Sequence, residues 1–353
     1  MIALTTTSIA WLIFVIILGG WVIYAILNLR QSRDELGSEI ELAPNRKPYF
    51  DDETLEGPRL TRVLGIGVIL LVIITVALPL YWILEPERQA GAQAAKEEQF
   101  IEWGSRLFAP TAEGGFNCAG CHGGMSATGG VAEYNLTDPT TGEVRAVNWA
   151  APALNTALYR FDEDEIRFIL VYGRPFSPMS PWGVDGGGPM NDQQIDTLIA
   201  YIRSIQIDRE DCAEGEDDPK TCASGHLPAD DQADIDTLAR QAVENGTYAS
   251  YGEALFNLEL ASGAYSCARC HTPGWSWGEP GVPGQGGMGW NLTGGRANTV
   301  FPAVDDMVAF IESGTTQGAK YGVQGQGTGR MPGFGAMLTD EQIDAIVEYV
   351  RSL

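Results

Sequence analysis

Basic residues and histidines are scarce in this chain of 353 residues. It has 22 lysines and arginines against 46 aspartates and glutamates, which gives a formal net charge of -24 at pH 7. A nucleic-acid-binding protein presents basic surface to the phosphates, so this balance excludes nucleic acid as a partner. Only three histidines are present, which limits how many metal ligands this residue type can supply.

Two long apolar runs near the N-terminus predict two transmembrane helices, at about residues 9–28 and 63–84. Each has the ~20 residues that cross the hydrocarbon core of a bilayer. A signal peptide begins with basic residues, which residues 1–8 lack, so we expect the first run to be retained. Basic residues lie between the runs, and the positive-inside rule therefore predicts a cytoplasmic loop with both chain termini outside. They are Arg30, Arg33, Arg46, Lys47, Arg59 and Arg62.

The region after residue 96 contains two copies of one pattern. Each copy opens with Gly-x-x-x-Phe, at Gly104 and at Gly252, and closes with an amphipathic helix that contains a tyrosine. The copies differ mainly in loop length, so duplication of one domain is the simplest account. We expect a membrane anchor at residues 1–96, domains at residues 97–204 and 246–353, and an acidic linker at residues 205–245.

Each copy also contains Cys-x-x-Cys-His, the attachment motif of c-type haem. Its two thiols add to the porphyrin vinyl groups, and the adjacent histidine ligates the iron. A zinc site would require further cysteine or histidine ligands at each place, and the sequence lacks them. The sequence therefore predicts two covalently bound haem c groups. The cofactor-binding cysteines are Cys118, Cys121, Cys267 and Cys270, and the proximal ligands are His122 and His271.

The sixth iron ligands cannot both be histidine, because only His226 remains after His122 and His271. Methionine is the usual other choice. Met179 and Met331 stand in equivalent loops, each shortly before the closing helix of its copy, and are the expected ligands. With both axial positions filled by protein, neither iron offers a site for substrate, which favours electron transfer over catalysis.

Other methionines remain as alternatives. Met190 and Met337 align with each other directly before the closing helices, and we expect both to pack as hydrophobic side chains. Met288, in a glycine-rich loop, is an alternative ligand for the second haem. The choice between these residues and the expected pair stays open at the level of sequence.

The remaining cysteines, Cys212 and Cys222, lie in the acidic linker without any other metal-ligand pattern. An oxidising compartment favours a disulfide between them. Two free thiols are the alternative.

The two domains resemble class I cytochromes c over about residues 97–353, through the Gly-x-x-x-Phe opening, Cys-x-x-Cys-His, the methionine loop and the closing helix. The resemblance implies an all-α fold, with two tandem domains packed around their haems behind the membrane helices. It also implies His122 with Met179, and His271 with Met331, as axial pairs.

The layout of two spans followed by a di-haem head is similar to that of cytochrome c subunits of respiratory complexes. Two families compete, the di-haem subunit of actinobacterial-type menaquinol:cytochrome c reductase and the di-haem subunit of cbb3-type oxidases. Either implies electron relay at the cell membrane, from a quinol-oxidising partner towards a terminal oxidase, with the haem domains on the extracytoplasmic side. The implied partners are cytochrome b, an iron–sulfur protein or an oxidase core. The alternatives are the cytochrome subunit of a periplasmic dehydrogenase and a di-haem peroxidase-type enzyme.

Overall fold

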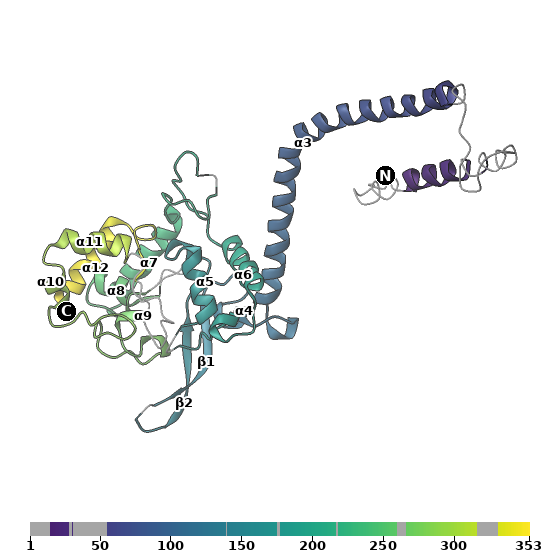
Figure 1. The fold of residues 1–353 in the computed structure, drawn as a ribbon. Helices are drawn as coiled ribbons and strands as arrows, with labels where there is room; N and C mark the ends of the chain where they lie inside the picture. The colour runs from purple at the N-terminus through teal and green to yellow at the C-terminus, as the bar shows by residue number, and fades with distance from the viewer. Residues whose placement is uncertain are drawn as a thin grey trace. The chain divides into compact units, whose positions relative to one another are not determined.

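The computed structural model describes residues 15–27, 30, 55–138, 140–174, 177–216, 218–259, 266–315 and 331–353. The chain divides into two compact units, Met1–Arg88 and Gln89–Leu353. Figure 1 shows the elements with the labels used below.

The first unit contains helix Val15–Leu27, the π-helical turn η1 (Leu55–Arg59) and the beginning of α3 (Leu60–Phe108). Within the described ranges, α3 is the one helix that is long and apolar enough to cross a membrane. Its large apolar side chains up to Leu84 are exposed, as lipid-facing side chains are in a bilayer. Helix Val15–Leu27 is shorter than the predicted first span, whose ends lie outside the described residues, so a second span stays a prediction.

The second unit is mostly helical. Its helical elements are η2 (Thr111–Glu113), α4 (Cys118–His122), η3 (Ala157–Tyr159), α5 (Glu163–Tyr172), η4 (Val184–Gly186), α6 (Asp192–Ser204), α7 (Ala229–Glu244), α8 (Tyr251–Asn257), α9 (Ala268–His271), η6 (Trp275–Trp277), α10 (Arg296–Val300), α11 (Val304–Ser313) and α12 (Asp340–Ser352).

The same helix crossing occurs twice in this unit. The end of α3 meets α6 at Gly104, and α8 meets α12 at Gly252. A Cβ atom on either glycine would lie 1.9 Å from a backbone oxygen of the facing helix, which belongs to Thr197 or to Ala345. Only glycine therefore permits either approach. An aromatic pair packs one turn further along each crossing, Phe108 with Tyr201 and Phe256 with Tyr349, at ring-centroid distances of 5.2 and 5.3 Å.

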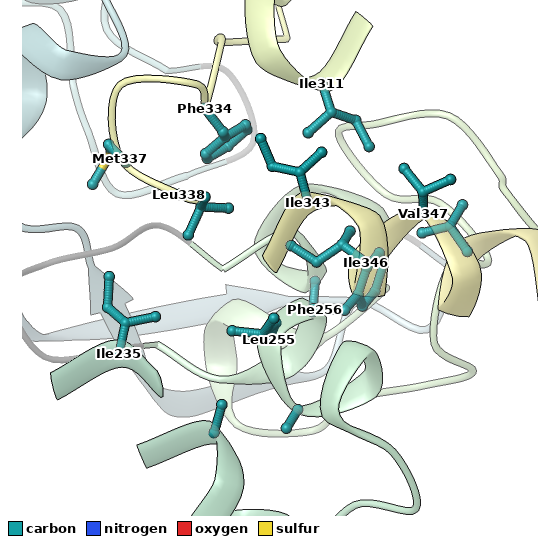
Figure 2. Packing of buried hydrophobic residues seen from close by; sticks show 14 of the residues in the cluster. Ile235, Leu255, Phe256, Ile311, Phe334, Met337, Leu338, Ile343, Ile346 and Val347 are labelled. Carbon is teal, nitrogen blue, oxygen red and sulfur yellow. The ribbon is translucent and has the colours of Figure 1, made fainter. Parts of the chain in front are cut away.

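Each crossing is part of a hydrophobic core. The amphipathic helices α6 and α12 bury the apolar faces that their spacing predicted, and each begins with a capping box, made by Asn191 with Gln194 and by Thr339 with Gln342. Figure 2 shows the second core, where α12 packs against side chains from α7, α8 and α11. The buried residues labelled there are Ile235, Leu255, Phe256, Ile311, Phe334, Met337, Leu338, Ile343, Ile346 and Val347.

A β-hairpin corrects the expectation of an all-α chain. Strands β1 (Gly130–Thr137) and β2 (Val144–Ala151) pair antiparallel, and the Asp138 carboxylate accepts hydrogen bonds from the amides of Thr140 and Thr141 in the turn. Along β2 the buried side chains alternate with less buried ones, as a two-residue period requires. The prediction was wrong here because the resemblance implies only helices, whereas the alternating residues of β2 form a strand whose buried side packs against the second domain.

The segment between the domains is ordered by several contacts. Cys212 and Cys222 form a disulfide, as the sequence predicted. The buried Leu227 belongs to the second core, and its amide donates to the Ala336 oxygen at 2.8 Å. Helix α7 also contributes to this core, through Ile235. The later part of the predicted linker is therefore packed against the second domain.

Candidate haem sites

The first haem motif forms the short helix α4, with His122 at its end. His122 is 8% exposed, and its Nδ1 lies 2.8 Å from the backbone oxygen of Pro152. A carbonyl oxygen only accepts hydrogen bonds, so Nδ1 carries the proton and donates it. The lone pair of Nε2 is then the one available to a metal.

The second motif repeats this arrangement in α9. His271 Nδ1 lies 2.8 Å from the backbone oxygen of Trp290 and donates to it for the same reason. Gly289 packs flat against the imidazole, where a Cβ atom would lie 2.7 Å from the ring carbon Cε1. Both histidines therefore have the tautomer and the fixed ring orientation that a metal ligand requires.

Burial sets the protonation state of both motifs. It lowers the pKa of His122 and of His271 below the usual value, which keeps each imidazole neutral and able to ligate. Burial also raises the pKa of Cys118 to about 11 and that of Cys267 to about 12. The four cysteines of the two motifs form no disulfide bonds. Cysteine thiols beside a neutral histidine are the groups from which thioether attachment of haem begins.

The two expected methionine ligands lie in loops that the structure builds in the same way. Helix α5 ends at Gly173 with φ +70°, and α11 ends at Gly314 with φ +67°. A Cβ atom on Gly173 would lie 2.5 Å from the oxygen of Met179, and one on Gly314 would lie 2.5 Å from the oxygen of Met331. Met179 and Met331 are both partly buried against the core of their own domain. Sequence reasoning did not single out these glycines, although each follows an apolar helical pattern.

The other methionines differ from this pair. Met190 and Met337 are only 0% and 1% exposed and belong to the two cores, in agreement with the packing role expected of them. Met288 is exposed, in the same loop as Gly289 and therefore close along the chain to the carbonyl that holds His271. The burial pattern thus favours Met179 and Met331 as the sixth iron ligands, which stays a prediction.

The residues present fit a c-type haem in both domains. Each motif supplies two cysteines outside any disulfide and a neutral imidazole with Nε2 available. Each domain also has a half-buried methionine in a loop that a glycine shapes. Nitrogen and thioether sulfur are the donor atoms that low-spin haem iron takes in cytochromes c. Sequence reasoning missed the carbonyl partners of the histidines, because Pro152 and Trp290 are distant from the motifs in sequence.

Comparison with known families agrees with this geometry. Residues 101–206 match the family model described as cytochrome c, and residues 252–350 match the model described as cytochrome c oxidase, cbb3-type, subunit III. No curated protein and no solved structure matches the chain.

Proposed function

We propose that this chain, a c-type cytochrome with two cytochrome c domains, is the di-haem electron-relay subunit of a membrane respiratory complex. The observation that carries the proposal is the repeated site. In each domain a histidine donates from Nδ1 to a backbone oxygen, next to two cysteines that form no disulfide bond. Two such sites in one chain are suited to passing single electrons.

Each side chain then has a stated role. Cys118 and Cys121 would hold the first haem through thioether bonds, and Cys267 and Cys270 the second. His122 with Met179 and His271 with Met331 would supply the iron ligands. The bound haem would supply one-electron iron chemistry. Apolar surroundings would raise its reduction potential by disfavouring the more highly charged oxidised form.

The membrane anchor would hold the two cytochrome domains at the extracytoplasmic face of the membrane. Helix α3 is long and apolar enough to span the bilayer and continues directly into the first cytochrome domain. The disulfide and the c-type motifs both suit an oxidising, extracytoplasmic compartment, and the basic residues before α3 suit the cytoplasmic side. Electrons pass from a quinol-oxidising partner towards a terminal oxidase, within a menaquinol:cytochrome c reductase or a cbb3-type oxidase.

The test is purification of the full chain from membranes with its natural partners. We expect two haems per chain that resist extraction by acidic acetone, and spectra of two six-coordinate low-spin irons. A high-spin haem that binds cyanide or peroxide would contradict the relay and favour a peroxidase-type enzyme. Co-purification of cytochrome b or an oxidase core supports the proposal, whereas a dehydrogenase subunit in their place would contradict it.

A further inference from the structure

Arg269 is a buried arginine inside the second haem motif, between Cys267 and Cys270. It is 5% exposed, and its guanidinium forms an ion pair with Glu259 and donates from Nη1 to the backbone oxygen of Ala150. The same group lies over the ring of Trp275, 4.9 Å from its centroid. A buried charge is tolerated only where such partners hold it, so this side chain has one fixed position.

The acceptor of this hydrogen bond belongs to the other domain. Ala150 is the penultimate residue of β2, and the chain then reaches Pro152, whose oxygen accepts the hydrogen bond from His122. Residues 150–152 therefore link the two haem motifs. His122 of the first motif donates to the oxygen of Pro152, and Arg269 of the second motif donates to the oxygen of Ala150. Arg269 lies two positions before His271.

The hairpin contacts both motifs elsewhere as well. At the start of β1, a Cβ atom on Gly130 would lie 2.6 Å from the oxygen of Cys121 in the first motif. From β2, Trp149 packs against Trp277, which lies just beyond the second motif, with ring centroids 5.2 Å apart. The β-hairpin therefore contacts the first motif through the start of β1 and the second motif through the end of β2.

Arg269 belongs to the second motif, but its guanidinium donates to the same strand end that leads to Pro152, the partner of His122. Its positive charge therefore lies close to both motifs.

We propose that Arg269 is a positioning residue that couples the two haem sites, by fixing the second motif to the strand that holds His122, and that electrons pass between the haems at this junction. The inference rests on the proposed function. The exchange transfers one electron, so one iron is oxidised as the other is reduced, and no proton moves and no bond breaks. Arg269 keeps its charge throughout.

The experiment compares Arg269→Gln, Glu259→Gln and the control Arg145→Gln in the full-length di-haem protein. Arg145 forms an exposed ion pair with Glu279 across the same pair of domains, but neither residue belongs to a haem motif. The readouts are the midpoint potential of each haem by spectroelectrochemistry, the rate of electron equilibration between haems after pulsed reduction, and amide hydrogen exchange at residues 150–152.

A positive charge disfavours the oxidised, more positive haem, so its removal lowers the potential and removal of its anionic partner raises it. We expect Arg269→Gln to lower the potential of the first haem and Glu259→Gln to raise it. We also expect Arg269→Gln to slow equilibration at least tenfold and to speed exchange at residues 150–152, while Arg145→Gln changes none of the three. Opposite shifts of the first haem's midpoint potential in the two variants indicate a charge effect. A general loss of packing would shift the potential in the same direction in both variants.

Arg269→Gln with two haems attached and all three readouts equal to those of Arg145→Gln would overturn the inference. If Arg269→Gln fails to attach the second haem, the Glu259→Gln variant tests the inference instead, because Glu259 lies outside the motif. An unchanged midpoint potential of the first haem in Glu259→Gln would then overturn the inference. Failure of the proposed function is separate, because it would appear in the unsubstituted protein as missing haem.

Discussion

Trp149 and Trp277 pack against each other between the two cytochrome domains, with ring centroids 5.2 Å apart and ring planes tilted by 38°. Trp149 is buried on β2, and Trp277 closes η6 just after the second haem motif. An aromatic pair contributes ~0.5–1.5 kcal/mol beyond its buried area. The contact therefore stabilises the junction between the two cytochrome domains.

Trp277→Ala tests this contribution. We expect the free energy of unfolding to fall by about 1–3 kcal/mol, because the variant loses the ring pair and part of the apolar surface at the junction. Denaturant unfolding of the haem-loaded protein measures the change. Val304→Ala is the control, because that side chain is 47% exposed and lies outside both haem motifs, and a substitution there is worth within about 0.5 kcal/mol. Equal losses in the two variants would contradict a role for the ring pair.

Met331→Ala tests the predicted sixth ligand of the second haem. We expect a lower midpoint potential for that haem and an iron that binds added cyanide, because thioether ligation raises the potential and fills the site. Visible spectra with and without cyanide measure both. Met337→Ala, at a buried core position, should destabilise the domain without opening the iron. If Met288→Ala opens the iron and Met331→Ala does not, the ligand assignment is wrong.

Gly252→Ala tests the close crossing of α8 and α12. The added methyl group would lie 1.9 Å from the Ala345 oxygen, so the helices must separate, and we expect a loss of about 1–3 kcal/mol or more. Thermal unfolding of the full-length protein measures the loss. Gly91 in α3 is the matched control, because a Cβ atom there meets nothing within 4 Å. Gly91→Ala should stabilise the helix by ~0.5–1 kcal/mol. A lower stability in both variants would contradict a specific role for the close crossing.

Cys212→Ser with Cys222→Ser tests the disulfide, whose sequence separation is 10 residues. A loop of this size lowers the entropy of the unfolded chain, so we expect the double variant to lose about 3 kcal/mol. Unfolding monitored by circular dichroism measures the change. Each single variant leaves one free thiol and should lose a similar amount. No difference from the unsubstituted protein would show that the bridge is absent or irrelevant to stability.

Tyr159→Phe tests a dependence on alkaline pH. Burial raises the pKa of Tyr159 to about 12, whereas an unfolded tyrosine ionises near pH ~10. The unfolded chain therefore releases this proton first, and the contribution of Tyr159 is full below pH ~10 and declines as the pH rises towards about 12. We expect the stability difference between the unsubstituted protein and Tyr159→Phe to shrink over this window. A difference that stays constant from pH ~9 to 11 would contradict the shift.

The sequence by itself determined the features that depend on short spacing or on repetition. Cys-x-x-Cys-His is local chemistry, and the repeated order of glycine, phenylalanine, haem motif and tyrosine predicted that one domain is duplicated in the chain. The span in α3 follows from the length of its apolar run. The buried faces of α6 and α12 follow from helical periodicity. The disulfide could be predicted because only one pair of cysteines remained outside the motifs.

The tertiary structure decided whatever joins residues that are distant along the chain. The carbonyls of Pro152 and Trp290 fix the two histidines, and neither position has a signature, because any residue carries a backbone oxygen. The contact of Arg269 with Ala150 depends on how two domains dock, and the variable positions of a haem motif do not reveal their neighbours. The hairpin was missed for the related reason that a few alternating residues become a strand only when a packing surface buries one side.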